Sequence, residues 1–167
     1  MAITTVDERK VQKHMLIYSS IVERMTRRSF QAVQDHNYGD VLKGVASRNL
    51  THRFAGPNSL GGSRHDKDAL ARWFKRLGTV LPTLRLDVKD VLVHGGPRNT
   101  TVIVRWVATT TLATGEPYVN PGVHVIKLRW GKAYDFDVYE DTYVVTDALA
   151  KQAASGITEA IAPQIVS

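Results

Sequence analysis

The stretch RWVATTTLATGEPYVNPGVH, residues 105–124, decides the fold. Segments rich in β-branched and aromatic residues form its two ends and continue beyond them, and its middle holds two glycines and two prolines. This pattern predicts two strands, residues 100–112 and 123–130, joined by a connection. Further strands are expected over residues 84–93 and 133–145, with HGGPRN and WGK as the turns. The second half is therefore predicted to be an antiparallel meander of long strands.

The first half is predicted to be mainly helical. Between residues 8 and 37 apolar residues recur every three to four positions, which is typical of one face of a long helix. These residues are Val11, Met15, Tyr18, Val22 and Met25. A short helix over residues 41–46, a short strand in NLTHRFAG, a helix over 66–77 and a last helix near 146–154 are also expected. Helices followed by a long antiparallel sheet indicate an α+β fold in which the sheet curls over the helices.

The length and composition fit one globular domain. The chain has 167 residues, of which 43% are apolar and 23% are charged, and no long linker or internal repeat divides it. A single domain over residues 1–167 is expected, with tails at about 1–7 and 157–167. No apolar run reaches the roughly 18–20 residues that span a bilayer, and the first residues lack the apolar core of a signal peptide. A cytoplasmic protein without a membrane partner is therefore expected.

The residue types also limit the chemistry. Since the chain has no cysteine, thiol nucleophiles, disulfides and cysteine-ligated metals are excluded. The six histidines lack the spacing of metal ligands, so a metal site is not expected. A net charge of +6 suits a nucleic-acid partner, but the basic residues stand among acidic ones on predicted helix faces. Solvated helix faces are predicted instead of a nucleic-acid site.

A second stretch, GKAYDFDVYEDT over residues 131–142, places four carboxylates in or at the end of a predicted strand. A regular two-residue hairpin loop at WG puts His124 on the same face as the three aspartates. A three-residue loop with a bulge instead matches the face of His124 with the apolar Tyr134, Phe136 and Val138. Periodicity leaves both registers open.

These two stretches resemble the nuclear transport factor 2-like superfamily, in particular its SnoaL-like domains and the related limonene epoxide hydrolase-like and ketosteroid isomerase-like proteins. The matching positions are Arg105, Thr114-Gly115, Tyr118, Gly122-Val123, Gly131-Lys132 and Tyr139-Glu140-Asp141. The resemblance implies an α+β cone, with N-terminal helices packed in a curved mixed or antiparallel sheet. The second aspartate of the hydrolase pattern falls on Val107, which cannot protonate an epoxide. The resemblance therefore implies a site without fixing its reaction.

In these families the aspartate of the Tyr-x-Asp element enters the cavity as a general base. The resemblance assigns this role to Asp141. It therefore favours the hairpin register that places Asp141 beside His124. Arg105 is expected to pair with Asp141 or hold an oxyanion, and His124 to act as a second acid or base. The residues expected to contact the substrate are Tyr118, Trp106, His52 and Tyr139.

The implied function is cofactor-independent proton transfer, of the isomerase, cyclase, dehydratase or hydrolase type, on an apolar small molecule. A non-catalytic ligand-binding or assembly module of the same fold is the alternative. The resemblance also implies a homodimer through the sheet.

Overall fold

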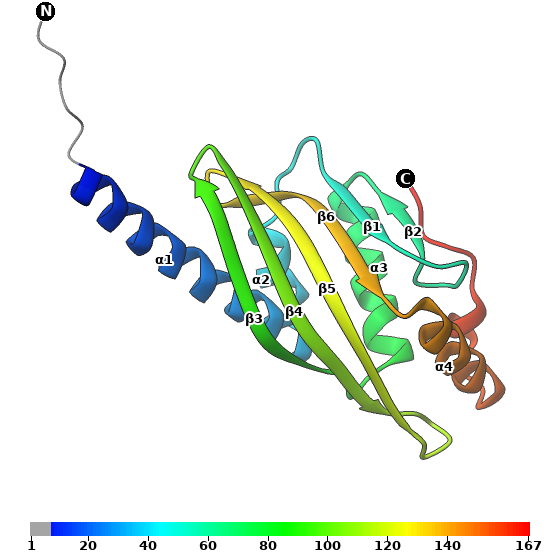
Figure 1. Ribbon diagram of the computed structural model, residues 1–167. Coiled ribbons are helices and arrows are strands. Elements are labelled where there is room, and N and C mark those ends of the chain that lie inside the picture. The colour runs from blue at the N-terminus through cyan, green and yellow to red at the C-terminus, as the bar shows by residue number, and fades with distance from the viewer. Residues whose placement is uncertain (1–7) are drawn as a thin grey trace, which may run out of the picture.

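The computed structural model describes residues 8–167, so the predicted tail at residues 1–7 lies outside the described part (Figure 1). The elements are α1 (Glu8–Gln34), α2 (Tyr38–Lys43), β1 (Thr51–Phe54), β2 (Gly62–Arg64), α3 (Lys67–Val80), β3 (Arg85–Gly96), β4 (Asn99–Thr111), β5 (Pro117–Arg129), β6 (Lys132–Glu140), α4 (Thr142–Ala154) and a 3-10 helix, η1 (Thr158–Ile161). The predicted α+β fold is confirmed. Within the described residues, none of the helices combines the length and apolar character needed to cross a membrane.

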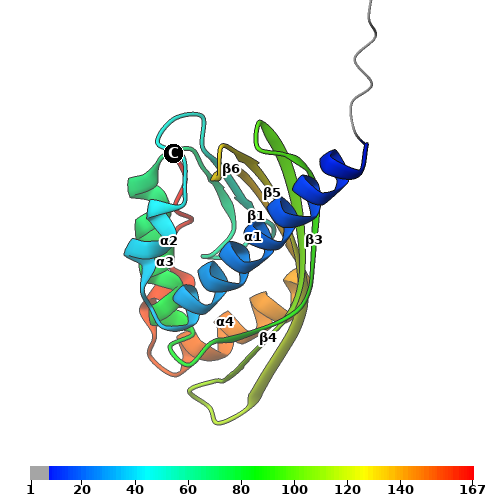
Figure 2. The same cartoon turned by 90° about the vertical axis from the view of Figure 1, so that its left-hand side faces the viewer.

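All six strands belong to one sheet, in the order β2-β1-β6-β5-β4-β3. β1 runs parallel to β6, and all other neighbours are antiparallel, so the sheet is mixed. The predicted four-stranded meander forms its larger part. Figure 2 shows the sheet curving around the helices, and this curvature produces the concave face on which the site is built.

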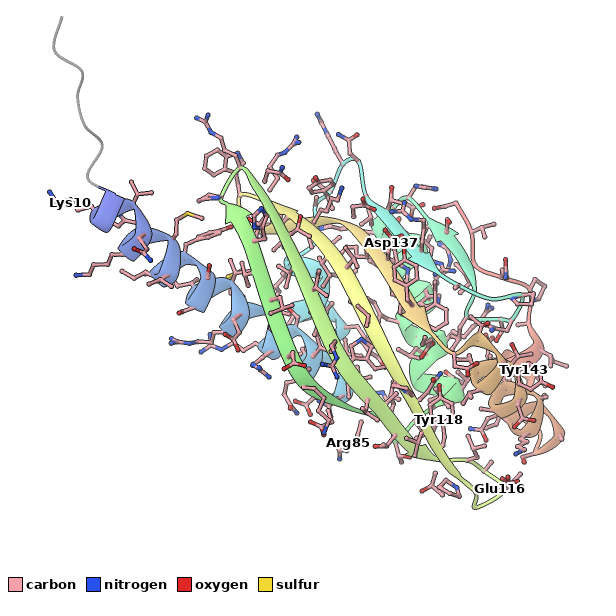
Figure 3. The ribbon with its side chains drawn as sticks, viewed as in Figure 1. Lys10, Arg85, Glu116, Tyr118, Asp137 and Tyr143 are labelled. Carbon is pink, nitrogen blue, oxygen red and sulfur yellow. The ribbon has the colours of Figure 1, made fainter. Side chains whose placement is uncertain are left out.

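Helix α1 packs on the concave side with its C-terminal half, while its N-terminal half, marked by Lys10, projects beyond the sheet (Figures 1 and 3). The buried residues Val22, Thr26 and Phe30 recur every four positions and form one stripe along the helix. The hydroxyl groups of Tyr18 and Thr100 share a hydrogen bond of 2.5 Å, which ties the helix to β4.

Helix α3 covers another part of the concave face. Its apolar residues are buried as their spacing predicts, namely Leu70, Trp73, Phe74 and Leu77. Each such side chain stabilises the fold by roughly 1.5–3 kcal/mol relative to exposure. The carboxylate of Asp66 accepts a hydrogen bond from the Ala69 amide at 2.7 Å and caps the helix. The helix therefore begins directly after Asp66.

The hairpin between β5 and β6 combines features of both predicted registers. Its loop has two residues, Trp130 and Gly131, with φ of 52° and 73°, as a tight hairpin turn requires. Across the turn, Arg129 pairs with Lys132, Leu128 with Ala133, and Lys127 with Asp135. Tyr134 has no partner in this ladder and is the extra residue of a β-bulge. The structure thus has the two-residue loop of the first predicted register and the bulge of the second.

The bulge decides which side chains of β6 face the helices. Beyond it, Ile126 pairs with Phe136, His124 with Val138, and Gly122 with Glu140. Paired residues share a face, so Glu140 faces inward. Asp135 and Asp137 face outward, where both form ion pairs with Arg53. The register that sends Asp141 inward is therefore wrong.

The C-terminal part differs from the sequence-based expectation. β6 ends at Glu140, and α4 begins at Thr142, where a strand to residue 145 is predicted. The segment 157–167, predicted as a tail, packs on the fold. The Ile165 carbonyl accepts a hydrogen bond from Arg64 Nε at 2.7 Å, and the Ser167 hydroxyl accepts one from the His65 amide at 2.8 Å.

Candidate active site

A cavity of about 120 Å³ lies between the concave face of the sheet and helices α1 and α3. One water needs roughly 10–15 Å³ of such space, so the cavity holds several waters or a compact organic ligand. Its wall is mostly apolar and includes Phe30, Leu70, Trp73, Leu84, Ile126 and Phe136. A cavity of this composition removes a ligand from bulk water.

Few polar side chains interrupt this wall. They are Ser29 from α1, His52 from β1, Trp106 from β4, Tyr118 and His124 from β5, and Glu140 from β6. Ligand sites commonly combine an apolar wall with a small number of polar groups that orient the ligand. The cavity is therefore the candidate active site.

Glu140 is the only carboxylate among the described residues that line the cavity. The Asn120 amide Nδ2 donates a hydrogen bond to Glu140 Oε2 at 3.3 Å. Burial disfavours the charged form and, together with the charge of the neighbouring Asp141, raises the pKa of Glu140 to about 8. At neutral pH most Glu140 side chains are therefore protonated, and a small pH change alters the ionised fraction.

Tyr118 lies near Glu140, close to the β4–β5 hairpin tip that Glu116 marks in Figure 3. The fully buried Asn120 donates from Nδ2 to the Tyr118 hydroxyl oxygen at 3.2 Å and to the Asp141 carbonyl at 3.0 Å. Burial, and then the charge of Glu140, raises the pKa of Tyr118, so the phenol keeps its proton. Because its oxygen already accepts a hydrogen bond, its O–H group remains a donor.

His124 is held by Trp106 of the neighbouring strand. The indole Nε1 donates a hydrogen bond to His124 Nδ1 at 2.7 Å. Burial lowers the pKa of His124 to about 4, so the ring is neutral at pH 7. The Trp106 ring lies over Gly122, where a Cβ atom would come within 2.3 Å of the indole. Only glycine at this position leaves room for the indole that holds His124.

A residue of β2, Arg64, holds His52 through a hydrogen bond of the same kind. Arg64 Nη1 donates a hydrogen bond to His52 Nδ1 at 3.0 Å. Burial, followed by the positive charge of Arg64, lowers the pKa of His52 well below its usual range. The His52 ring also contacts Trp73 edge-on, with 4.7 Å between ring centroids. The cavity therefore contains two neutral histidines in fixed positions.

The comparison with known protein families matches this architecture. The model of the SnoaL-like domain matches residues 26–136. The chain belongs to the SnoaL-like domain family. The predicted resemblance is thereby confirmed. No curated protein matches the chain.

Solved structures share the fold of this SnoaL-like protein. TerC, co-crystallised with polyporic acid, is 20% identical, with a TM-score of 0.65 over 76% of this chain and 96% of its own. IdmH, a proposed polyketide cyclase from Streptomyces antibioticus, is 15% identical, with a TM-score of 0.63 over 77% and 98%. An NTF2-like protein of unknown function from Burkholderia pseudomallei is 21% identical, with a TM-score of 0.67 over 76% and 95%. At these identities the likeness concerns the fold alone.

The structure places Asp141 of this SnoaL-like domain outside the cavity, in contrast to the prediction. Asp141 is exposed and is the N-cap residue of α4. Its Oδ1 accepts hydrogen bonds from the amides of Tyr143, at 2.9 Å, and Val144, at 3.3 Å. The physical reason is the bulge at Tyr134, which turns the neighbouring Glu140 inward. A capping role accounts for the aspartate at this position.

Arg105 and Tyr139 are also misplaced by the prediction. The Arg105 side chain is 66% exposed and forms an ion pair with Asp90 at 2.8 Å. Its strand neighbours Val104 and Trp106 face inward, so alternation directs Arg105 outward. Tyr139 is 55% exposed for the same reason. The predicted convergence of Arg105, Asp141 and His124 is therefore wrong.

Glu140 is the cavity-lining carboxylate that sequence reasoning missed, although a signal for it exists. Phe136 and Val138 are apolar residues two positions apart in β6, and Glu140 continues their two-residue alternation. A strand face that carries a phenylalanine and a valine is the buried one. The four other predicted residues, His124, Tyr118, Trp106 and His52, do line the cavity. Within residues 8–167 no group of three or more histidine and carboxylate side chains is placed to hold a metal.

Proposed function

We propose that this SnoaL-like protein is an enzyme that transfers protons on an apolar, oxygen-bearing small molecule, with Glu140 as the general base. The observation that carries the proposal is the single carboxyl group in an apolar cavity, with its pKa raised to about 8. A base is most effective when its pKa lies near the working pH. Glu140 takes the role that the resemblance gave to Asp141.

The proposed reaction needs the residues of this chain and no cofactor. Ionised Glu140 removes a proton from a carbon next to a carbonyl group, and the electron pair of the broken C–H bond moves to the carbonyl oxygen. N–H and O–H donors such as His124 and Tyr118 stabilise the resulting enolate. Glu140 then returns the proton to another position. Isomerisation and cyclisation both begin with this step.

The known structures support the ligand class. TerC was co-crystallised with polyporic acid, and IdmH is a proposed polyketide cyclase. Polyporic acid and polyketides are both oxygenated organic compounds. A compact oxygenated compound is therefore the ligand that we propose for this chain.

The pH dependence of exchange tests the proposal. The ketone 2-tetralone is apolar and has exchangeable protons beside its carbonyl group. We expect the protein-dependent rate of deuterium incorporation to rise about tenfold per pH unit below pH 8 and to level off above it, because only ionised Glu140 acts as a base. Proton NMR in D2O, with protein-free samples subtracted, measures this rate. A profile that is flat between pH 6 and 9 contradicts the proposal.

We also infer self-association through the outer face of the sheet. Exposed apolar residues occur on three strands of this face, with Leu92 on β3, Val119 on β5 and Tyr139 on β6 being 61%, 58% and 55% exposed. A partner that covers this face would remove all three from water. The same surface favours the second candidate function, a binding or assembly module without catalysis.

A further inference from the structure

The two histidines of the cavity share one arrangement. Trp106 Nε1 donates to His124 Nδ1 at 2.7 Å, and Arg64 Nη1 donates to His52 Nδ1 at 3.0 Å. Neither an indole N–H nor a guanidinium group can accept a hydrogen bond. Nδ1 therefore carries the lone pair in both rings. The single proton of each neutral imidazole must be on Nε2.

These Nε2–H groups are available to a ligand. Among the described residues, neither His52 nor His124 makes a hydrogen bond through Nε2, and both rings line the cavity. The two histidines come from β1 and β5, the strands on either side of β6. His52 pairs with Phe136, and His124 pairs with Val138, which is on the same face of β6. One wall of the cavity thus presents two fixed N–H donors.

The polar groups of the cavity are uncharged at neutral pH. The lowered pKa values of His124 and His52 keep both rings neutral. The raised pKa of Tyr118 keeps its phenol protonated, and the raised pKa of Glu140 keeps its carboxyl group protonated in most molecules. Each of these four groups offers an N–H or O–H hydrogen. A ligand that carries acceptor oxygens and no charge is complementary to such a cavity.

Arg64 is buried without a carboxylate partner among residues 8–167, and its side chain is 0% exposed. Its Nε donates a hydrogen bond to the Ile165 carbonyl, and its Nη2 donates to the carbonyl groups of Leu60 and Gly61. The ring of Trp73 lies 5.4 Å from the guanidinium carbon. These contacts join the C-terminal segment and the loop before β2, and they also hold the charge next to His52. Burial lowers the pKa of Arg64 to about 10, so the group remains charged at pH 7. A permanent charge beside Nδ1 prevents protonation of His52 and fixes its tautomer.

We propose that His52 and His124 are a matched pair of N–H donors for carbonyl oxygens of the ligand, and that Arg64 and Trp106 are positioning residues that hold them in this state. The inference rests on the proposed function for its site and names the ligand class, a compact uncharged compound with carbonyl oxygens. An anion would be repelled by Glu140 when it ionises, and a cation would meet N–H groups.

Two bicyclic probes with the same carbon skeleton test the pair. We expect 1,4-naphthoquinone to bind at least about tenfold more tightly than naphthalene, because only the quinone has oxygens that accept from the two rings. Isothermal titration calorimetry at pH 7 measures both affinities. The absence of cysteine excludes thiol adducts of the quinone. Equal affinities for the two probes would overturn the inference.

Variants then separate donation from packing. His124→Phe and His52→Phe should each lower quinone affinity about tenfold and leave naphthalene affinity within about twofold, because they keep an aromatic ring and remove the donor. Trp106→Phe retains His124 but removes its partner. ¹⁵N NMR of labelled histidine should show a single Nε2–H tautomer for His124 in the unmodified protein and a mixture in Trp106→Phe.

The contrary results are distinct from failure of the proposed function. An Nδ1–H tautomer for either histidine in the unmodified protein refutes the paired-donor inference directly, and this readout does not depend on the stability of any variant. Loss of affinity for both probes in a histidine variant indicates a packing role and also refutes it. Neither result removes Glu140 as the base, a role that the pH dependence of 2-tetralone exchange tests separately.

Discussion

Glu140→Gln should lower the rate of α-proton exchange on 2-tetralone by at least about 100-fold, the smallest contribution typical of a positioned general base. The amide oxygen of glutamine still accepts the hydrogen bond that Asn120 Nδ2 donates to Glu140 Oε2 at 3.3 Å. The variant therefore removes the titrating group and keeps the local contact. Proton NMR at pH 8 measures the rate, and calorimetry measures ketone affinity, which should remain within about threefold.

The adjacent residue provides a matched control. Asp141→Asn retains an oxygen that caps the amides of Tyr143 and Val144, because asparagine is as good an N-cap residue as aspartate. We expect its exchange rate to stay within about threefold of the unmodified protein. Its pH profile should move to slightly lower pH, since the charge of Asp141 raises the pKa of Glu140. Loss of rate in Asp141→Asn but not in Glu140→Gln would refute the assignment.

The same pair of variants distinguishes an enzyme from a binding module. A module without catalysis binds the ketone, shows no exchange above the protein-free rate, and keeps its affinity in Glu140→Gln. An enzyme shows exchange that depends on Glu140. The two candidate functions therefore predict different rates for the unmodified protein.

Insertion of one alanine after Tyr134 should prevent stable folding. With the one-residue bulge kept, the inserted residue shifts every later residue of β6 to the opposite face, which directs its aspartates toward the helices and Phe136 and Val138 toward water. Several kcal/mol is lost for each buried, unpaired carboxylate, against a total stability of about 5–15 kcal/mol for a domain. Near-ultraviolet circular dichroism and a thermal melt measure the loss of tertiary structure.

Tyr134→Ser is the control for this insertion. Serine keeps the extra residue and therefore the bulge, and loses only the ring, whose centroid is 5.5 Å from the Arg129 guanidinium carbon. We expect a cost of about 1 kcal/mol or less in the free energy of unfolding. An insertion variant as stable as Tyr134→Ser would show that the number of residues at the bulge does not determine the facing of β6.

The elements with a strong periodic signal could be predicted from the sequence. α1 and α3 carry apolar residues every three to four positions, and the meander has long β-branched runs with clear turns. β2 could not be predicted, because its three residues, Gly62–Arg64, are held by pairing with β1 and contain no apolar pattern. The segment at 157–167 is ordered by contacts with Arg64 and His65 that are distant in sequence.

The lining of the cavity was predicted better than its proposed chemistry. The family resemblance placed His124, Tyr118 and Trp106 at the cavity, and all three line it. It also placed Arg105 there, although the alternation of β4 directs that side chain outward. Asp141 was assigned to the cavity by its number of residues from the Gly131-Lys132 turn. One extra residue in the ladder reverses the face on which every later residue of β6 lies. The alternation of Phe136, Val138 and Glu140 correctly indicates that these three side chains face the cavity.

A titration of Glu140 by ¹³C NMR tests the central claim most directly. The carboxyl resonance, assigned by its absence in Glu140→Gln, should titrate with a midpoint near pH 8, because burial and the neighbouring Asp141 raise its pKa. A surface glutamate titrates near 4.3. A midpoint near pH 8 supports Glu140 as the base of an apolar active site. A midpoint between 4 and 5 places this carboxyl group in water and contradicts the account.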